Sequence, residues 1–532
     1  MPSTPPTTAP PVGRFNRADL RSGFLVALIA LPLCLGIALA SGFPPVAGLL
    51  TAIVGGVLVT LLGSARLTIK GPAAGLIVIA IGAVTELGGG DTALGYRRAL
   101  AVGVVAAVIQ IILALCRAAS VGVAMSPSVV HGMLAAIGVI IIAKQAHVVL
   151  GVTPEGAEPL ELLAEIPRSV IHANPAIVGI GLLSLLILFG LPLIRARWAK
   201  AVPAPLVVLA VAVPLGLLLH LAQPHDYQLF GAGHHLGPEH LVRLPGSLLD
   251  AVAFPDFSVI TSAASIKYVV MFALIGSIES TLTVLAVDAM DPERRASDYN
   301  RDLLALGGGN LVASLIGGLP MISEIVRSRA NIDAGARSRW SNFAHGAILL
   351  ILVAAAPAVL QTIPLAALAA MLVYTGARLA SPSELTRLRR IGLDQAALFL
   401  TTLIVTLATD LLLGVAAGLL LKLVVHLVRG APARAIVRPR AEARRDGDTL
   451  HVRVPDAAIF TALTPVRNAV RRAGDPPPRT VTIDVGDARL VDHTFLSRLQ
   501  DMAREWPGVT LTVRGLEKLR ATSDHPHATR RR

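Results

Sequence analysis

Long apolar runs separated by short polar loops occupy the chain from Leu20 to Val428. Most runs hold about 20 residues, the length that crosses about 30 Å of hydrocarbon as a helix. The pattern therefore predicts about fourteen transmembrane spans. They lie near residues 20–41, 44–63, 72–87, 97–117, 128–150, 172–194, 202–222, 266–289, 302–318, 324–338, 342–360, 364–380, 395–410 and 411–428.

Two of these segments depart from a continuous apolar helix. Residues 67–75 alternate like a strand and then break at a Gly-Pro pair, where a helix can begin. Residues 318–331 carry a glutamate and two arginines between apolar spans. Each interruption is third in its set of seven spans, and paired interruptions are typical of inverted repeats with a midplane binding site. We therefore predict two repeats, over 19–222 and 265–429, each with one half-helix.

Beyond residue 429 the chain has a soluble pattern. Residues 430–448 are basic and polar, as expected for a juxtamembrane linker. Residues 449–520 follow the order strand, helix, strand, helix, strand, which predicts a small α/β domain. We expect a disordered N-terminus over 1–18, a transmembrane domain over 19–429 and a free tail over 521–532.

The composition indicates a mostly α-helical membrane protein. Of 532 residues, 54% are hydrophobic and 15% are charged, whereas soluble domains average about 25% charged residues. The net charge of +13 would suggest nucleic-acid binding in a soluble chain. Here the basic residues cluster in loops and in the tail, so membrane topology explains them, and we expect a lipid bilayer and no nucleic-acid partner.

The charge bias of the loops predicts the orientation. With the N-terminus in the cytoplasm, the inside loops hold about fifteen Lys and Arg residues and the outside loops about six. Both termini are therefore predicted to be cytoplasmic.

Short motifs, strong through their order and spacing, resemble those of the sulfate-permease (SulP) anion transporters, which are related to vertebrate prestin and pendrin. The resemblance covers nearly the whole chain, and the soluble part is similar to the family's STAS domain. The motifs are Asp19–Gly23, Leu31-Pro32, Ser41–Leu49, Lys70–Ala74, Asn300–Ala305, Gly309–Leu311, Gly317–Pro320, Arg327 with Asn331, and Val491–Thr494.

The resemblance implies seven plus seven spans, a core domain that moves against a gate domain, and an anion site between the half-helices of spans three and ten. It implies secondary active transport of a small inorganic anion across a bacterial plasma membrane, coupled to Na⁺ or H⁺ or by exchange, in a homodimer. Half-helix N-termini suit an anion because their N–H groups are unpaired. The expected substrate-binding residues are Arg327, Lys70, Gly71, Pro72, Ala73, Ser323, Ser328 and Asn331.

Four positions depart from the family pattern. Leu33 replaces a common glutamine, and Lys70 stands where a small or apolar residue is usual. Glu324 and Val326 occupy positions that are often small. These changes favour a site with a lysine, an arginine and two carboxylates, and they place bicarbonate slightly ahead of sulfate.

Arg327 is the expected anion anchor, because its planar guanidinium binds an oxyanion bidentately and stays charged. The alternatives are an ion pair with Glu324 or a side chain that reaches the cytoplasmic rim. Lys70 either adds a second positive charge or ends its strand near cytoplasmic water. If Glu324 pairs with Arg327, a proton or cation must neutralise it before the anion binds, which would make symport obligatory.

Glu279 lies in an otherwise apolar run and is the expected coupling residue. It could take up a proton or, with Ser280 and Thr283, supply hard oxygen ligands for Na⁺. The alternative is a buried counter-ion for a nearby cation. We assign Glu324 to the same coupling-ion set and expect no metal site or other cofactor.

Asp492 and Thr494 lie in the loop where STAS domains carry regulatory residues, and Thr494 could be phosphorylated. The alternative is an ordinary helix N-cap. A cytoplasmic partner of this domain is possible.

Two rival functions remain open. One is an organic-anion or nucleobase carrier on the same fold, against which Leu33, Val326 and 4% aromatic residues argue. The other is a membrane scaffold or sensor that acts through its STAS domain. We do not expect an enzyme, because the chain has no nucleophile–base constellation or phosphate loop.

Overall fold

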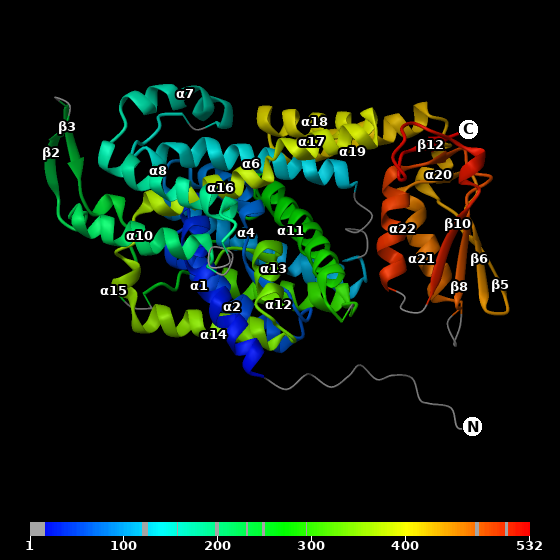
Figure 1. Ribbon diagram of the computed structural model, residues 1–532, viewed down its shortest axis with the longest axis horizontal. Helices are drawn as coiled ribbons and strands as arrows, with labels where there is room; N and C mark the ends of the chain where they lie inside the picture. The colour runs from blue at the N-terminus through cyan, green and yellow to red at the C-terminus, as the bar shows by residue number, and fades with distance from the viewer. Residues whose placement is uncertain are drawn as a thin grey trace.

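The computed structural model describes residues 16–119, 126–156, 158–196, 202–229, 232–246, 250–293, 295–473, 478–505 and 509–532. A large helical part is joined to a small α/β part, which lies at the right of the view in Figure 1. Most of the expected N-terminal tail lies outside the described residues, and the first helix already begins at Arg17.

The helical part contains both long and short helices. Its first half contains α1 (Arg17–Ala40), α2 (Pro45–Leu62), η1 (Ala74–Leu76), α3 (Ile77–Gly88), α4 (Thr92–Leu115), α6 (Pro127–Val149), α7 (Pro159–Ile171), α8 (Pro175–Gly190), η2 (Leu191–Leu193) and α10 (Ala204–Leu218). Its second half contains α11 (Ala263–Met290), α12 (Tyr299–Leu315), α13 (Ile325–Asp333), α14 (Trp340–Ala355), α15 (Pro357–Leu360), α16 (Leu365–Leu379), α17 (Pro382–Ile391), α18 (Leu393–Ala408) and α19 (Leu411–Val428).

Eight helices in the described part of the chain are long and apolar enough to cross a membrane. Four more are apolar but shorter: the η1–α3 segment, α10, α14 and α18. Each expected span contains a helix, so the molecule is a mostly helical membrane protein. The hairpin of β2 (His225–Leu229) and β3 (Ala232–Leu236) and the amphipathic helices α7 and α17 were not predicted.

The two interruptions seen in the sequence meet as a short antiparallel sheet. Strand β1 (Ile69–Pro72) pairs with β4 (Met321–Glu324), with Lys70 opposite Ser323 and Gly71 opposite Ile322. A helical segment starts directly after each strand: η1 and α3 after β1, and the short α13 after β4. The sheet therefore brings the starts of two half-helices together inside the helical part.

Close helix packing around this sheet depends on glycine. A Cβ atom on Gly56 of α2 would collide with the backbone of Gly346 on α14. Likewise, a Cβ atom on Gly23 of α1 would collide with Ala344 and with the α14 backbone. Helices α1, α2 and α14 therefore approach to backbone contact, as small residues allow in membrane proteins.

The α/β part is built on a four-stranded sheet with the order β10-β8-β6-β5. Strands β6 (Thr449–Arg453), β8 (Thr480–Asp484) and β10 (Thr510–Arg514) are parallel, and β5 (Glu442–Asp446) is antiparallel to β6. In Figure 1, α21 (Leu463–Arg471) and α22 (His493–Glu505) lie between this sheet and the helical part. The predicted order strand, helix, strand, helix, strand is present.

Two boundaries differ from the expectation. Residues 430–448, expected to be a linker, include α20 (Ala433–Val437) and the edge strand β5. Residues 521–532, expected to be a free tail, include β12 (Arg530–Arg531), which pairs with both β11 (Arg520–Ala521) and β9 (Leu490–Val491). A second small sheet results, in the order β11-β12-β9-β7, where β7 spans Ala457–Ala458. Both β5 and β12 are polar and carry no hydrophobic alternation, so the pattern could not reveal them.

The contact between Gly56 and Gly346 predicts that a larger side chain at this position lowers the stability of the protein. Gly56→Leu forces α2 and α14 apart, so we expect a loss of about 1–3 kcal/mol, the usual effect of overpacking. The measurement is the melting temperature of the detergent-purified protein. Gly179→Leu on α8 is the control, because a Cβ atom there meets nothing within 4 Å. Equal melting temperatures for the two variants would contradict the packing argument.

Candidate functional site

The site begins with strand edges that must find hydrogen bonds inside a membrane protein. Asn342 on α14 covers β1: its Oδ1 accepts from the Lys70 backbone N–H at 3.1 Å, and its Nδ2 donates to the Gly55 carbonyl at 2.9 Å. Asn310 on α12 covers β4, accepting from the Met321 N–H at 2.6 Å and donating to the Met321 carbonyl at 3.1 Å. Side-chain amides thus replace the missing neighbouring strands.

Two predicted substrate-binding residues belong to the same framework. The Ser328 hydroxyl accepts from the Ile69 N–H at 2.9 Å and donates to the Glu324 carbonyl at 2.6 Å. The Asn331 side chain donates to the Leu67 carbonyl at 2.9 Å and also bonds to serines of α1 and α14. Both side chains hold α13 in place and have little capacity left for a substrate.

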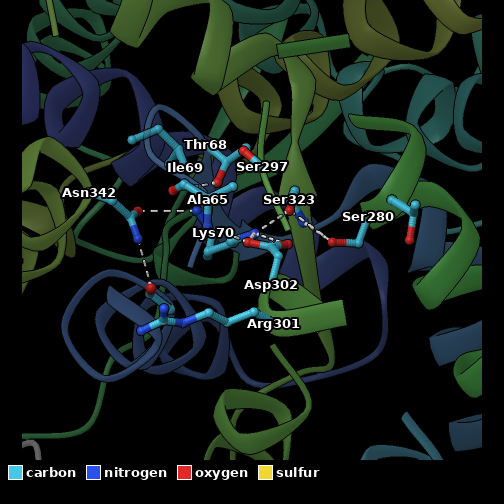
Figure 2. A network of polar contacts seen from close by, with 12 residues as sticks. Ala65, Thr68, Ile69, Lys70, Ser280, Ser297, Arg301, Asp302, Ser323 and Asn342 are labelled. Atoms are coloured by element: carbon cyan, nitrogen blue, oxygen red, sulfur yellow. Dashed lines mark hydrogen bonds and ion pairs between the residues drawn. The ribbon is translucent and has the colours of Figure 1, made fainter. Parts of the chain in front are cut away.

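Lys70 is engaged in a buried ion pair rather than open to an anion. Its Nζ donates to both carboxylate oxygens of Asp302 at 2.7 Å and also to the Ser323 hydroxyl. Ser323 in turn bonds to the Ser280 hydroxyl at 2.8 Å (Figure 2). Of the two alternatives for Lys70, the one that ends its strand near water is wrong, because its side chain is 0% exposed.

Arg327 is the buried cation with unused donors. It lies in the first turn of α13. Its side chain is 1% exposed, and its Nη2 donates to the Pro72 carbonyl at 3.3 Å. Within the described residues, Nε and Nη1 have no hydrogen-bond partner, and no ion pair joins Arg327 to Glu324. Gly71 provides the space, since a Cβ atom there would lie 2.5 Å from Nη1.

Two carboxylates lie at the start of the other half-helix. The Glu324 carboxylate lies near the backbone N–H of Ala74, the first residue of η1. A Cβ atom on Gly75 would collide with both carboxylate oxygens of Glu279. Glu279 is buried, and its Oε1 has no hydrogen-bond partner among the described residues. The positive end of η1–α3 therefore faces protein carboxylates.

The other predicted site residues surround this pair. Ala73 is buried directly before η1, and Thr283 is buried one helical turn after Glu279 on α11. Ser280 bonds to Ser323 and therefore connects α11 to β4. The structure thus gathers the predicted residues around one sheet, but their contacts differ. Ser328 and Asn331 hold the backbone in place, and Lys70 is neutralised in an ion pair. Within the described residues Arg327 keeps unpartnered donors, and Glu279 and Glu324 form a pair of carboxylates.

Sequence reasoning missed two buried residues. Asp302, within the Asn-Arg-Asp run of α12, also accepts from the Ala65 N–H at 2.6 Å. Its place in that motif was the signal available. His345 on α14 is fully buried, and both of its ring nitrogens are unpartnered among the described residues. It lies close enough to Arg327 to interact with that charge. Nothing in its sequence surroundings indicated this position.

The predicted regulatory residues lie at the contact between the two parts. Asp492 caps α22 by accepting from the Phe495 N–H at 2.7 Å, whereas Thr494, for which the N-cap alternative was considered, lies inside the first turn of the helix. It also forms an ion pair at 3.2 Å with Lys422 near the end of α19. Thr494 accepts from the Lys422 ammonium at 2.7 Å and is 1% exposed. Both residues are therefore covered by the helical part.

Comparisons with known proteins agree with this arrangement. The chain is similar to a putative sulfate transporter, YvdB, of Bacillus subtilis, with 24% identity over 89% of this chain and 86% of the relative. It is similar to the bicarbonate transporter BicA of Picosynechococcus, with 25% identity over 78% of this chain and 70% of that protein. These relatives are transporters, not enzymes.

Solved structures show the same fold. The transmembrane domain of a cyanobacterial BicA matches with a TM-score of 0.63, 24% identity, and coverage of 76% of this chain and 97% of that domain. The structure of SLC26A9 matches with a TM-score of 0.67, 16% identity, and coverage of 93% and 84%. A model described as the sulfate permease family matches residues 17–403. The chain therefore belongs to the sulfate permease family.

Proposed function

We propose that this chain is a secondary transporter of a small inorganic anion of the bicarbonate or sulfate class in a bacterial plasma membrane. It has fourteen spans in a seven-plus-seven inverted repeat, with both ends in the cytoplasm. The observation that carries the proposal is the Arg327 guanidinium, which is buried with Nε and Nη1 unpartnered within the described residues. A buried charge with free donors suits an oxyanion, and such charges in membrane proteins mark substrate pathways.

The carboxylates at η1 suggest how a cation couples to the anion. The Glu324 carboxylate lies near the Ala74 N–H, which a half-helix would otherwise offer to an anion, and Glu279 lies beside Gly75. An anion approaching this end meets two like charges. A proton or a Na⁺ ion at the pair removes that repulsion, so anion and cation bind together. Bicarbonate, with one charge, meets less repulsion than sulfate.

The α/β part is proposed to be a STAS domain that reports on the state of the transport domain. Its helix α22 is tied to α19 through Asp492 and Lys422. Movement of α19 would therefore displace the start of α22. A homodimer and a cytoplasmic partner of this domain complete the proposal.

Removal of the guanidinium tests the anion site. We expect Arg327→Ala to lower uptake of labelled bicarbonate or sulfate into proteoliposomes about 10- to 100-fold, since hydrogen bonds to charged groups contribute about 1.5–3 kcal/mol. Uptake is measured with and without an inward Na⁺ or H⁺ gradient. Arg329→Ala is the matched control: that arginine lies on the same helix but is exposed and paired with Asp333. No flux of either anion in the unmodified protein would favour the scaffold function.

Filling the space beside the guanidinium should act in the same way. In Gly71→Ala the new methyl group displaces Nη1 of Arg327, and we expect the apparent anion affinity to fall about tenfold, equal to about 1.4 kcal/mol. The measurement is the concentration dependence of uptake. Gly190→Ala, where a Cβ atom meets nothing within 4 Å, is the control. An unchanged affinity would place the anion elsewhere.

The contact between the two parts can be separated from the helix cap. Asp492→Asn keeps a capping side chain but removes the charge facing Lys422, whereas Asp492→Ala removes both, with about 1 kcal/mol from the cap. We expect faster amide hydrogen exchange at the end of α19 in both variants, and at the start of α22 mainly in the alanine variant. Asp487→Asn, which breaks an exposed pair with Arg453, is the control. Unchanged exchange at α19 would argue against the coupling.

A further inference from the structure

The Lys70 ammonium occupies a pocket of oxygen atoms. Its Nζ lies 2.7 Å from each Asp302 carboxylate oxygen and contacts the Ser323 hydroxyl, which in turn bonds to the Ser280 hydroxyl (Figure 2). The side chains of Lys70 and Asp302 are 0% and 3% exposed. One cation therefore joins β1, α12 and β4, and through Ser280 also α11.

The donors around Nζ are those that a small hard cation prefers. Carboxylate and hydroxyl oxygens bind hard cations, and here two carboxylate oxygens and a hydroxyl converge on one point. Without the ammonium, Asp302 would keep only the Ala65 N–H at 2.6 Å among its contacts in the described residues. A buried carboxylate with so little compensation is strongly unfavourable.

We propose that Lys70 is a tethered cation: its ammonium fills an oxygen-lined position that a diffusible monovalent cation would otherwise have to occupy. The inference rests on the proposed function for its role in transport. Because the ammonium cannot dissociate, β1 and β4 stay joined to α12 throughout the cycle. Lys70 is thus a positioning residue, and ion coupling is left to Glu279 and Glu324.

A pocket vacated by the lysine should accept Na⁺. We expect Lys70→Ala to lower anion uptake in choline buffer by about tenfold or more, because one partner of a buried pair is missing. In Na⁺ buffer of equal ionic strength, uptake by the variant should recover toward that of the unmodified protein measured in the same buffer. Na⁺ should also raise the melting temperature of the purified variant by about 2 °C more than it does for the unmodified protein.

The melting measurement needs no transport, so it tests the tethered cation even if the proposed function fails. The double variant Lys70→Ala with Asp302→Asn lacks both charges and should lose the extra Na⁺ response. Lys267→Ala, which breaks the exposed pair with Glu86, should show no new response. Any response shared by all proteins belongs to the coupling carboxylates.

A second variant provides the same test if Lys70→Ala does not fold. Lys70→Ser adds a hydroxyl oxygen to the vacated pocket and should show the same Na⁺ response. Equal stability in Na⁺ and choline, relative to the unmodified protein, would overturn the inference. Failure of both variants to fold in saturating Na⁺ would also overturn it, because a diffusible cation then cannot replace the ammonium.

Discussion

The hydrogen-bond demand of non-helical backbone inside a membrane protein governs this structure. Strands β1 and β4 satisfy one edge of each other, which leaves two outer edges without a neighbouring strand. Asn342 and Asn310 meet that demand from α14 and α12. The helices must therefore approach closely, and contacts such as Gly56 against Gly346 permit it.

The same framework separates the buried charges by role. Lys70 and Asp302 neutralise each other and hold elements together. Arg327 keeps two nitrogens unpartnered within the described residues, while Glu279 and Glu324 gather at the start of η1. To bind an anion together with a cation, a site needs a positive group with free donors for the anion and separate carboxylates for the cation. Charge count alone would not distinguish these roles.

The α/β part shares in this arrangement through α19. Lys422 is 3% exposed and meets Asp492 at 3.2 Å, while His426 one turn later lies 3.4 Å from the same carboxylate. On the other side, the Thr529 hydroxyl donates to Asp394 at 3.1 Å, at the start of α18. The last residues of the chain therefore contact the helical part and do not form a free tail.

Local pattern was enough to predict the long apolar helices, the two interruptions and the core strands, because burial in lipid or in a domain core imposes a period on the residues. It also marked Arg327 and Glu279 as charges in apolar surroundings. It could not predict the edge strand β5 or the two-residue strand β12, because their polar residues show no hydrophobic alternation. Nor could it predict the partner of Lys70, since Asp302 lies 232 positions away. Which buried charges neutralise each other and which stay open depends on distances that only the folded chain sets.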